Sequence, residues 1–167
     1  NVHGEDGMGD LGLIHPAGAA EAEHAADAIL RIVKTYPDEI EIVTIGPVTN
    51  VALAIMKDPA AMKRVKHIYS MGTTGFGPGN CTPVSVDAEA FHRMITAGIP
   101  VTIVGFDLCL GDAVLTKEDM EALMNSGKEE AVFSVKCNRL LAEYNLAAHN
   151  QYFVDLPDAV AMAVALW

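Results

Sequence analysis

Positions 39–50 read Glu39-Ile40-Glu41-Ile42-Val43-Thr44-Ile45-Gly46-Pro47-Val48-Thr49-Asn50. The first eight residues are rich in β-branched side chains, which is typical of a strand. A helical pattern follows over Pro47 to Met56, with the proline near its first turn and Asp58-Pro59 just beyond its end. A strand that turns within a few residues into a helix is the repeating unit of an α/β fold.

The same alternation of strands and helices continues on both sides of this stretch. An amphipathic helix is predicted over Glu21 to Tyr36, where Pro37 stops it. After position 56 the chain has a strand pattern at 65–70, a helix pattern at 87–97 and a strand pattern at 100–105. Parallel strands are joined by crossover connections, usually helices, so this order predicts an α/β fold with an open, mostly parallel sheet and flanking helices.

The C-terminal third is predicted to be helical. Thr116-Lys117-Glu118-Asp119 is a capping pattern that opens a short helix ending near Gly127, and from there on only helical patterns follow, at 129–147 and 157–167. No repeat or long linker divides the chain, so we expect residues 1–167 to form a single α/β domain. Because the chain opens in a glycine-rich loop and ends inside an apolar helix, we expect this domain to be incomplete at both ends.

Composition excludes several classes of protein. The chain has 167 residues, of which 51% are hydrophobic and 20% charged, as in a globular domain. Its 11 basic and 22 acidic side chains give a net charge of −11, which disfavours a nucleic-acid partner. No apolar run is long enough for a membrane span and no signal peptide is recognisable, so we expect a cytoplasmic protein. Cys81, Cys109 and Cys137 lack the spacing of a structural zinc site or a disulfide framework.

A glycine-rich loop follows the strand pattern at 65–70. The segment Met71 to Pro83 contains four glycines within eight residues and then Asn80, whose amide can both donate and accept hydrogen bonds. At the carboxyl end of a parallel strand such a loop either lines a ligand crevice or simply connects two elements. Local composition leaves both interpretations open.

Three other positions are candidates for binding chemistry, each with an ordinary structural alternative. His3 lies in an acidic, glycine-rich segment that can contact a ligand or a hard cation, or can be a solvated loop. The turn before Thr49 can offer a backbone carbonyl to calcium, or can be a plain strand-to-helix connection. Asp158 opens an apolar helix, where it can cap the first turn or, if it is buried, bind a metal.

Taken together, these segments resemble the inosine-uridine-type nucleoside hydrolase family. The likeness runs in order along nearly the whole chain. The matching segments are His3 to Gly12, Gly46-Pro47-Val48-Thr49-Asn50-Val51-Ala52-Leu53-Ala54, Met71-Gly72 through Gly79-Asn80 with Thr82-Pro83, Asp87-Ala88-Glu89-Ala90, Ala97 to Gly105, and Pro157-Asp158-Ala159-Val160-Ala161.

The resemblance implies an enzyme of nucleoside salvage that cleaves the N-glycosidic bond of ribonucleosides with the help of a calcium ion. It implies that Asp158 and the backbone carbonyl of Thr49 bind Ca²⁺, that Met71 and Asn80 contact the ribose, and that His3 lies near the base. The implied partner is a small nucleoside, with no nucleic acid and no membrane, and the implied assembly is a homodimer or homotetramer.

The sequence also departs from the family pattern. The Asp-rich motif that supplies further calcium ligands and the general base is missing, and so is the Glu-Phe-Asn run expected after Thr82-Pro83. Pro157 stands where many members carry a histidine. The catalytic residues are therefore unknown. The chain is interpreted as a fragment of an active hydrolase, or else as an inactive nucleoside- or ribose-binding homologue or a structural α/β subunit.

Overall fold

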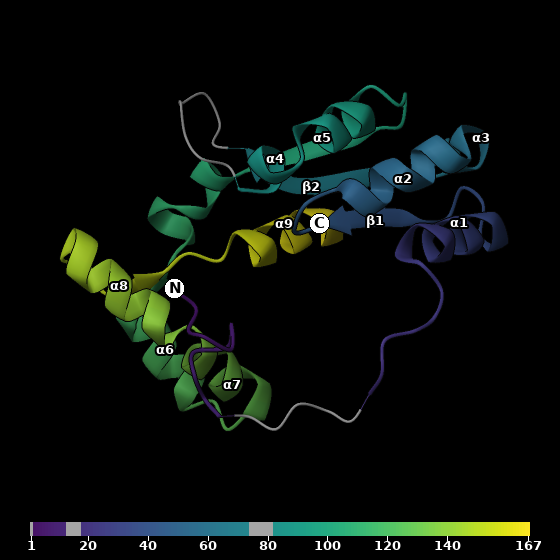
Figure 1. Cartoon of the computed structure of the whole chain (residues 1–167). Coiled ribbons are helices and arrows are strands. Elements are labelled where there is room, and N and C mark those ends of the chain that lie inside the picture. Colours follow the sequence, from purple (N-terminus) through teal and green to yellow (C-terminus); the bar gives the residue numbers. More distant parts are fainter. Residues whose placement is uncertain (1, 13–17, 74–81) are drawn as a thin grey trace. The chain divides into compact units, whose positions relative to one another are not determined.

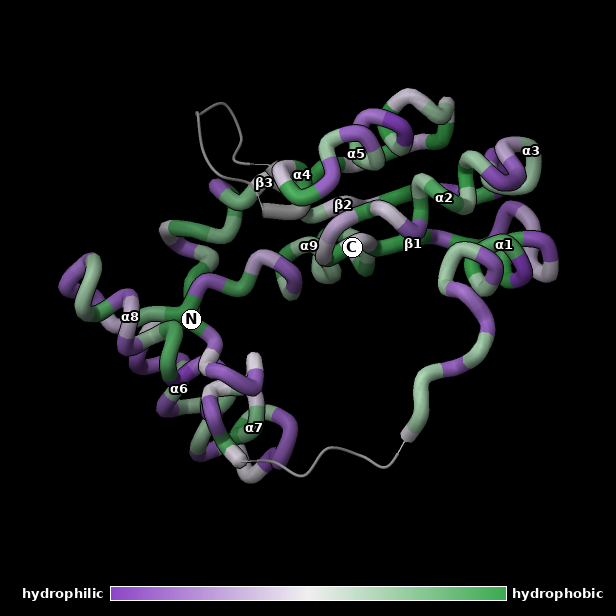
Figure 2. Tube along the Cα trace, in the orientation of Figure 1, coloured by the Kyte–Doolittle hydropathy of each residue, from purple (hydrophilic) through white to green (hydrophobic). Residues whose placement is uncertain are grey.

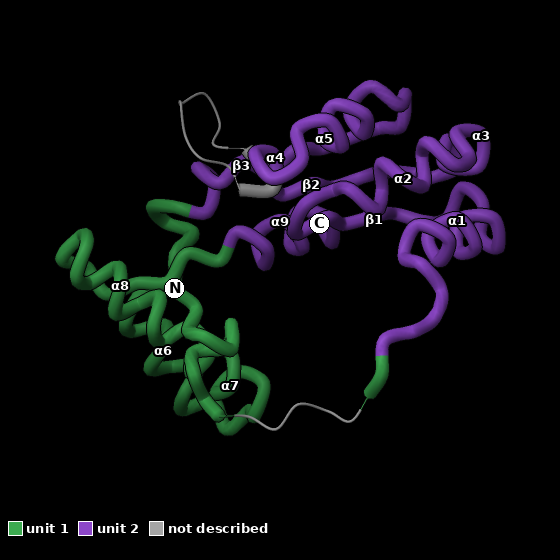
Figure 3. Tube along the Cα trace, viewed as in Figure 1, with its two compact units in different colours: residues 1–19, 110–156 green, residues 20–109, 157–167 purple. Residues whose placement is uncertain are grey.

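The computed structural model describes residues 2–12, 18–73 and 82–167. The chain divides into two compact units, drawn in different colours in Figure 3. We call residues 20–109 with 157–167 the sheet unit, and residues 1–19 with 110–156 the helical unit. The expectation that residues 1–167 form one domain, incomplete at both ends, stays a prediction.

The sheet unit is built on three parallel strands in the order β1-β2-β3, with β2 in the centre (Figure 1). Ile42 of β1 lies beside Ile68 of β2, and Ile68 lies beside Val101 of β3. The predicted parallel α/β architecture is therefore confirmed. The elements of the unit are α1 (Ala25–Thr35), β1 (Glu41–Thr44), α2 (Thr49–Lys57), α3 (Pro59–Met62), β2 (His67–Thr73), α4 (Thr82–Val86), α5 (Ala88–Ile95), β3 (Val101–Gly105), a 3-10 turn η1 (Phe106–Cys109) and α9 (Pro157–Leu166).

Side chains from the two faces of the sheet enter different hydrophobic clusters. Ile68 belongs to the larger cluster, which also holds the buried faces of α1, α2 and α5. Met71 is an odd number of residues further along β2 and therefore points to the opposite face. There it packs with Ala161 of α9, a helix that Figure 2 colours as hydrophobic over most of its length. Helices thus lie on both faces, as expected for a parallel sheet.

The helical unit has a small core of its own. Its elements are a 3-10 turn η2 (Gly111–Ala113), β4 (Leu115–Thr116), α6 (Lys117–Met124), α7 (Glu129–Cys137), α8 (Arg139–His149) and β5 (Phe153–Val154). The core is formed by Met120, Leu141, Ala142 and Val154. No helix in the described part of the chain is long and apolar enough to cross a membrane.

The prediction of helices only after Thr116 is wrong in one place. Phe153 pairs antiparallel with Thr116, and Val154 pairs with Leu115, in a two-stranded ribbon. The side-chain amide of Asn145 donates to the Phe153 carbonyl at 3.1 Å and helps to fix this strand. Two-residue strands are too short to produce a hydrophobic period, and their pairing depends on contacts between distant parts of the chain.

Two predicted helices have different bounds in the structure. The first begins at Ala25 rather than Glu21, because the His24 ring Nδ1 accepts from the Ala26 amide and caps the helix there. The helix predicted over 129–147 is two helices that meet at Asn138. The side-chain amide of Asn138 donates to the Ser134 carbonyl at 3.0 Å. Local bonds of this kind compete with the regular hydrogen bonds of a helix.

The fully buried Met94 of α5 offers a test of the larger cluster. We expect Met94→Ala to lower the free energy of unfolding by about 2–5 kcal/mol, because the truncated side chain leaves a cavity. Met56→Ala is the matched control, since Met56 on α2 is 59% exposed. Urea unfolding measures both variants, and an equal loss of stability in both would contradict this account of the core.

The capping box at the start of α6 makes the stability of the helical unit depend on pH. The Asp119 carboxylate accepts from the backbone amide and the hydroxyl of Thr116, and these bonds hold the pKa of Asp119 below its ordinary value. A pKa lowered by folding means that the stabilisation is present above the pKa of the unfolded chain and is lost as pH falls through the folded pKa.

We therefore expect Asp119→Ala to lower the melting temperature near neutral pH and to have a smaller effect below about pH 4. Glu118→Ala is the control, because it removes an acid of the same first turn that is outside the capping box. Thermal unfolding followed by circular dichroism at several pH values measures both. A deficit in Asp119→Ala that stays constant down to acid pH would rule out the ionised carboxylate as its source.

Candidate functional site

The predicted binding residues of the sheet unit lie near the carboxyl ends of the strands or open the helices of that unit. The strand β1 ends at Thr44, and the turn that follows it leads to Thr49. Met71 lies near the end of β2, and Asp158 lies in the first turn of α9. Open α/β sheets bind ligands outside the carboxyl ends of their strands, so this edge is the candidate site. Asn80 lies outside the described residues.

A buried pair of hydroxyl groups joins the last residue of β1 to the middle of β2. The Thr44 hydroxyl donates to the Ser70 hydroxyl, with 2.8 Å between the oxygens. Ser70 is fully buried and Thr44 is nearly so. A buried polar group without a partner is costly, so this bond favours one fixed arrangement of β1 against β2. The sequence shows both residues, but nothing in it indicates that they meet.

Thr49 is held by a carboxylate from another helix. It is the first residue of α2, and its hydroxyl donates to Oδ2 of Asp87 at 2.5 Å. The other oxygen of Asp87 accepts from the Ala90 amide at 3.0 Å and so caps α5. The Thr49 hydroxyl, with the Ala90 amide second, holds the pKa of Asp87 below its ordinary value. The pair was not predicted, because sequence spacing does not reveal a contact across 38 positions.

Met71 and Asp158 differ in exposure. Met71 is buried with Val104 and Ala161, on the face of the sheet that α9 covers. Asp158 is exposed, so the argument that a buried acid needs a metal partner does not apply to it. Asp158 lies in the first turn of α9, where the helix dipole favours a carboxylate whether or not a metal is present. Its role as a metal ligand stays a prediction.

His3 belongs to the helical unit, in a loop that is held together by its own acids. One oxygen of Asp10 accepts from the amides of Glu5 and Asp6, at 2.7 and 3.3 Å. One oxygen of Asp6 accepts from the amides of Met8 and Asp10, at 2.7 and 3.0 Å. These bonds favour the interpretation of a surface loop over that of a cation site. His3 itself is exposed, and its carbonyl accepts from the Gly9 amide.

Comparison with known proteins decides the family. The family model described as "Inosine-uridine preferring nucleoside hydrolase" matches residues 1–167. The chain belongs to this nucleoside hydrolase family. "Probable uridine nucleosidase 1" of Oryza sativa subsp. japonica is 33% identical over 96% of the chain and 51% of its own length. "Uridine nucleosidase 1" of Arabidopsis thaliana is 31% identical over 99% of the chain and 50% of its own length.

Solved nucleoside hydrolase structures agree with this assignment. The structure titled "Plant nucleoside hydrolase - PpNRh1 enzyme" has a TM-score of 0.90 and 27% identity, and the match covers 98% of the chain and 53% of that structure. A purine-preferring ribonucleoside hydrolase from Gardnerella vaginalis has a TM-score of 0.87 and 26% identity, over 98% of the chain and 54% of that structure. The chain therefore spans about half the length of the curated relatives and solved structures it matches.

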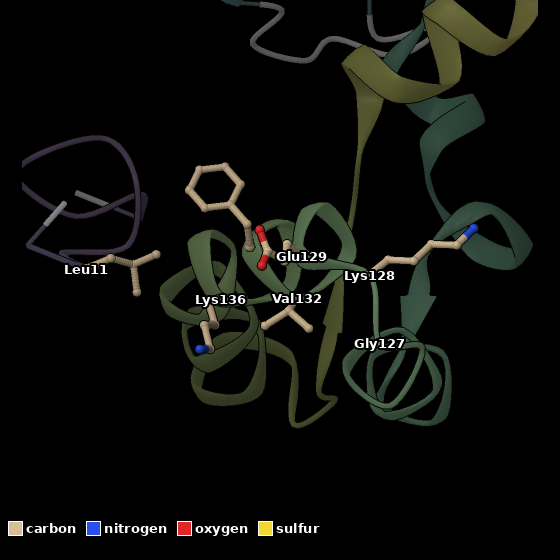
Figure 4. Close-up of a pocket in the computed structure, with 7 residues that line it drawn as sticks. Leu11, Gly127, Lys128, Glu129, Val132 and Lys136 are labelled. Carbon is tan, nitrogen blue, oxygen red and sulfur yellow. The ribbon is translucent and has the colours of Figure 1, made fainter. Parts of the chain in front are cut away.

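Surface hollows occur in both units of this nucleoside hydrolase chain, and the one in the sheet unit includes the predicted site residue Thr49. A hollow of about 450 Å³ lies in the helical unit (Figure 4), where Leu11 from the N-terminal loop faces Val132 and Lys136 of α7. A second, of about 320 Å³, lies in the sheet unit and includes Thr49 and Asp87. Within the described residues, no three acidic, histidine or cysteine side chains gather closely enough to hold a metal ion.

The hydroxyl pair between β1 and β2 gives a stability prediction. We expect Ser70→Ala to lower the free energy of unfolding by about 1–3 kcal/mol, since it leaves the buried Thr44 hydroxyl without this acceptor. The double variant Thr44→Val with Ser70→Ala removes both polar groups and should recover part of that loss. Chemical denaturation of the two variants measures the difference. If the double variant is clearly less stable than Ser70→Ala, the two hydroxyl groups are not coupled.

Proposed function

We propose that the protein, at its full natural length, hydrolyses the N-glycosidic bond of ribonucleosides and releases ribose and the free base. The observation that carries this proposal is the family match over all 167 residues, supported by solved nucleoside hydrolases with TM-scores of 0.83 to 0.90 at 25–27% identity. The expected substrates are small nucleosides, and the expected assembly is a homodimer or homotetramer in the cytoplasm.

The family is metal-dependent, and we propose calcium as the metal. The two candidate ligands on this chain are the Asp158 carboxylate and the Thr49 backbone carbonyl, and both are the oxygen donors that calcium prefers. Asp158 is exposed in the first turn of α9. Thr49 is the first residue of α2, and its carbonyl has a second lone pair beyond the one used in a helical hydrogen bond. The donor types fit calcium, although six to eight oxygens are needed and two are only part of that set.

When bound, a calcium ion would orient the sugar diol and lower the pKa of a water molecule. The chain's own residues do the rest of the positioning. Met71 lies near the end of β2 and packs against α9, and it would contact the ribose from there. Asn80 would donate to and accept from the sugar hydroxyls, and His3 would contact the base. No residue of this chain is assigned as general acid or base.

A second candidate function is binding of nucleosides or ribose without catalysis. It is favoured by two departures inside the chain: Pro157 stands where many family members carry a histidine, and the Glu-Phe-Asn run expected after Thr82-Pro83 is missing. In this case Asn80 and Thr49 serve binding alone.

Release of the nucleobase separates these candidates. We expect the full-length protein to hydrolyse uridine or inosine in the presence of Ca²⁺, as followed by ultraviolet absorbance. Binding of ribose without turnover would replace the hydrolase proposal with the binding proposal. If calorimetry gives no heat with ribose or with Ca²⁺, and no base is released, both proposals fail.

Removing the Asp158 carboxylate tests the metal assignment. We expect Asp158→Asn to weaken Ca²⁺ binding by at least about 10-fold, because the amide keeps the shape but loses the charge. Asp112→Asn is the control, since Asp112 is an exposed acid of the helical unit outside the proposed ligand set. Isothermal titration calorimetry with CaCl₂ measures both variants. Equal affinities for Asp158→Asn and the unsubstituted protein would remove Asp158 from the ligand set.

A further inference from the structure

We infer that Asp87 is a positioning residue, whose carboxylate ties the first turn of α2 to the first turn of α5 and so holds the Thr49 carbonyl in place for the ligand. This inference rests on the proposed function, in which that carbonyl faces the metal. Asp87 itself contacts neither metal nor substrate in the proposal. It acts through Thr49.

The two carboxylate oxygens of Asp87 accept hydrogen bonds from two different helices. Oδ2 accepts from the Thr49 hydroxyl at 2.5 Å, and Oδ1 accepts from the Ala90 amide at 3.0 Å. One carboxylate therefore fixes two helix starts that are 38 positions apart in the sequence. We call the hydrogen bond between the Thr49 hydroxyl and the Asp87 carboxylate the clamp. A hydrogen bond to an ionised carboxylate is stronger than one between neutral groups, so this bond can hold the two helix starts together.

The start of α2 has no side-chain cap of its own. Its N-cap residue is Val48, whose side chain cannot accept a hydrogen bond from the orphan amides of the first turn. Three other helices of the sheet unit have a side-chain cap: His24 caps α1, Asp58 caps α3 and Asp87 caps α5. The bond from Thr49 to Asp87 is thus the side-chain restraint that the structure places on this turn.

Asp58 shows what an ordinary cap looks like in the same chain. Its backbone angles, φ −149° and ψ 82°, nearly equal those of Asp87, φ −149° and ψ 78°. Its Oδ1 also accepts from an amide three residues on, that of Ala61, at 3.0 Å. Its other oxygen pairs with Lys34, a long and half-exposed side chain. Asp87 instead uses its second oxygen on a threonine hydroxyl, which sits two bonds from the backbone and so restrains the main chain itself.

The clamp also connects two segments that lie between a strand and a helix of the sheet unit. Thr49 ends the turn that follows β1, while Asp87 ends the segment that follows β2 and continues through α4. Below the clamp, α2 and α5 pack together in the larger cluster through Ala52, Ile55 and Met94. The apolar contact sets the distance between the helices, and the Asp87–Thr49 bond sets how their first turns meet. A loss of the clamp should therefore loosen the turn at Thr49 without unfolding the core.

Hydrogen exchange of backbone amides tests the clamp directly. In both Asp87→Ala and Thr49→Val, we expect the Ala52 amide, which donates to Val48 within the first turn of α2, to exchange about 5-fold faster. In Asp87→Ala the Ala90 amide should also exchange faster, whereas Thr49→Val keeps that cap. Thr49→Ser keeps a hydroxyl and should retain the slow exchange. Asp58→Ala is the matched control: it removes the cap of α3 and the ion pair with Lys34, and should leave the exchange of the Ala52 amide unchanged. Unchanged exchange at Ala52 in Asp87→Ala and Thr49→Val would overturn the inference.

The positioning role is tested by ligand binding in the full-length protein. We expect Asp87→Ala and Thr49→Val to weaken Ca²⁺ affinity and raise the KM for nucleoside by similar factors, with no further loss in the double variant. Asp58→Ala should change neither. If the unsubstituted protein binds Ca²⁺ and hydrolyses nucleosides while both variants keep its affinity and KM, the positioning role is wrong and the function stands. If the unsubstituted protein neither binds Ca²⁺ nor releases base, the function fails and hydrogen exchange still decides the clamp.

Discussion

The parallel pairing of β2 with both β1 and β3 is the constraint on which the sheet unit depends. Parallel neighbours cannot be joined by a tight turn, so the chain must cross back over a face of the sheet between strands. This requirement gives α2 and α5 their places and brings the carboxyl ends of all three strands to one edge. The starts of α2 and α5 then become neighbours, so that Thr49 and Asp87 meet although they are far apart in the sequence.

Hydrophobic packing and polar contacts have different tasks at this edge. The cluster under α1, α2 and α5 supplies most of the stabilisation, because burial of apolar surface is its main source. This cluster does not fix how individual residues are oriented, since apolar contacts have no preferred direction. The Thr44–Ser70 pair and the Asp87–Thr49 bond are directional, and they determine how β1, β2 and the helix starts are arranged.

Much of the fold could be predicted from local patterns. The strand at β1, the helix after Pro47 and the capping box at Thr116 follow from period and capping chemistry within a few residues, and the structure has all three. The misplaced boundaries have local causes that periodicity does not contain, namely the His24 ring at the start of α1 and the Asn138 amide between α7 and α8. The ribbon of β4 and β5 was missed because a two-residue strand has no period to detect.

The sequence by itself determined the α/β class, the alternation of strands and helices in the sheet unit and, through its motifs, the family to which the chain belongs. Strand and helix periods and turn residues act over short spans, so they can be seen in the order of residues. The tertiary structure alone decided that Asp158 is exposed, that Met71 is buried against α9 and that Asp87 holds Thr49. These facts depend on which distant segments meet, and that is fixed only when the crossovers fold back onto the sheet.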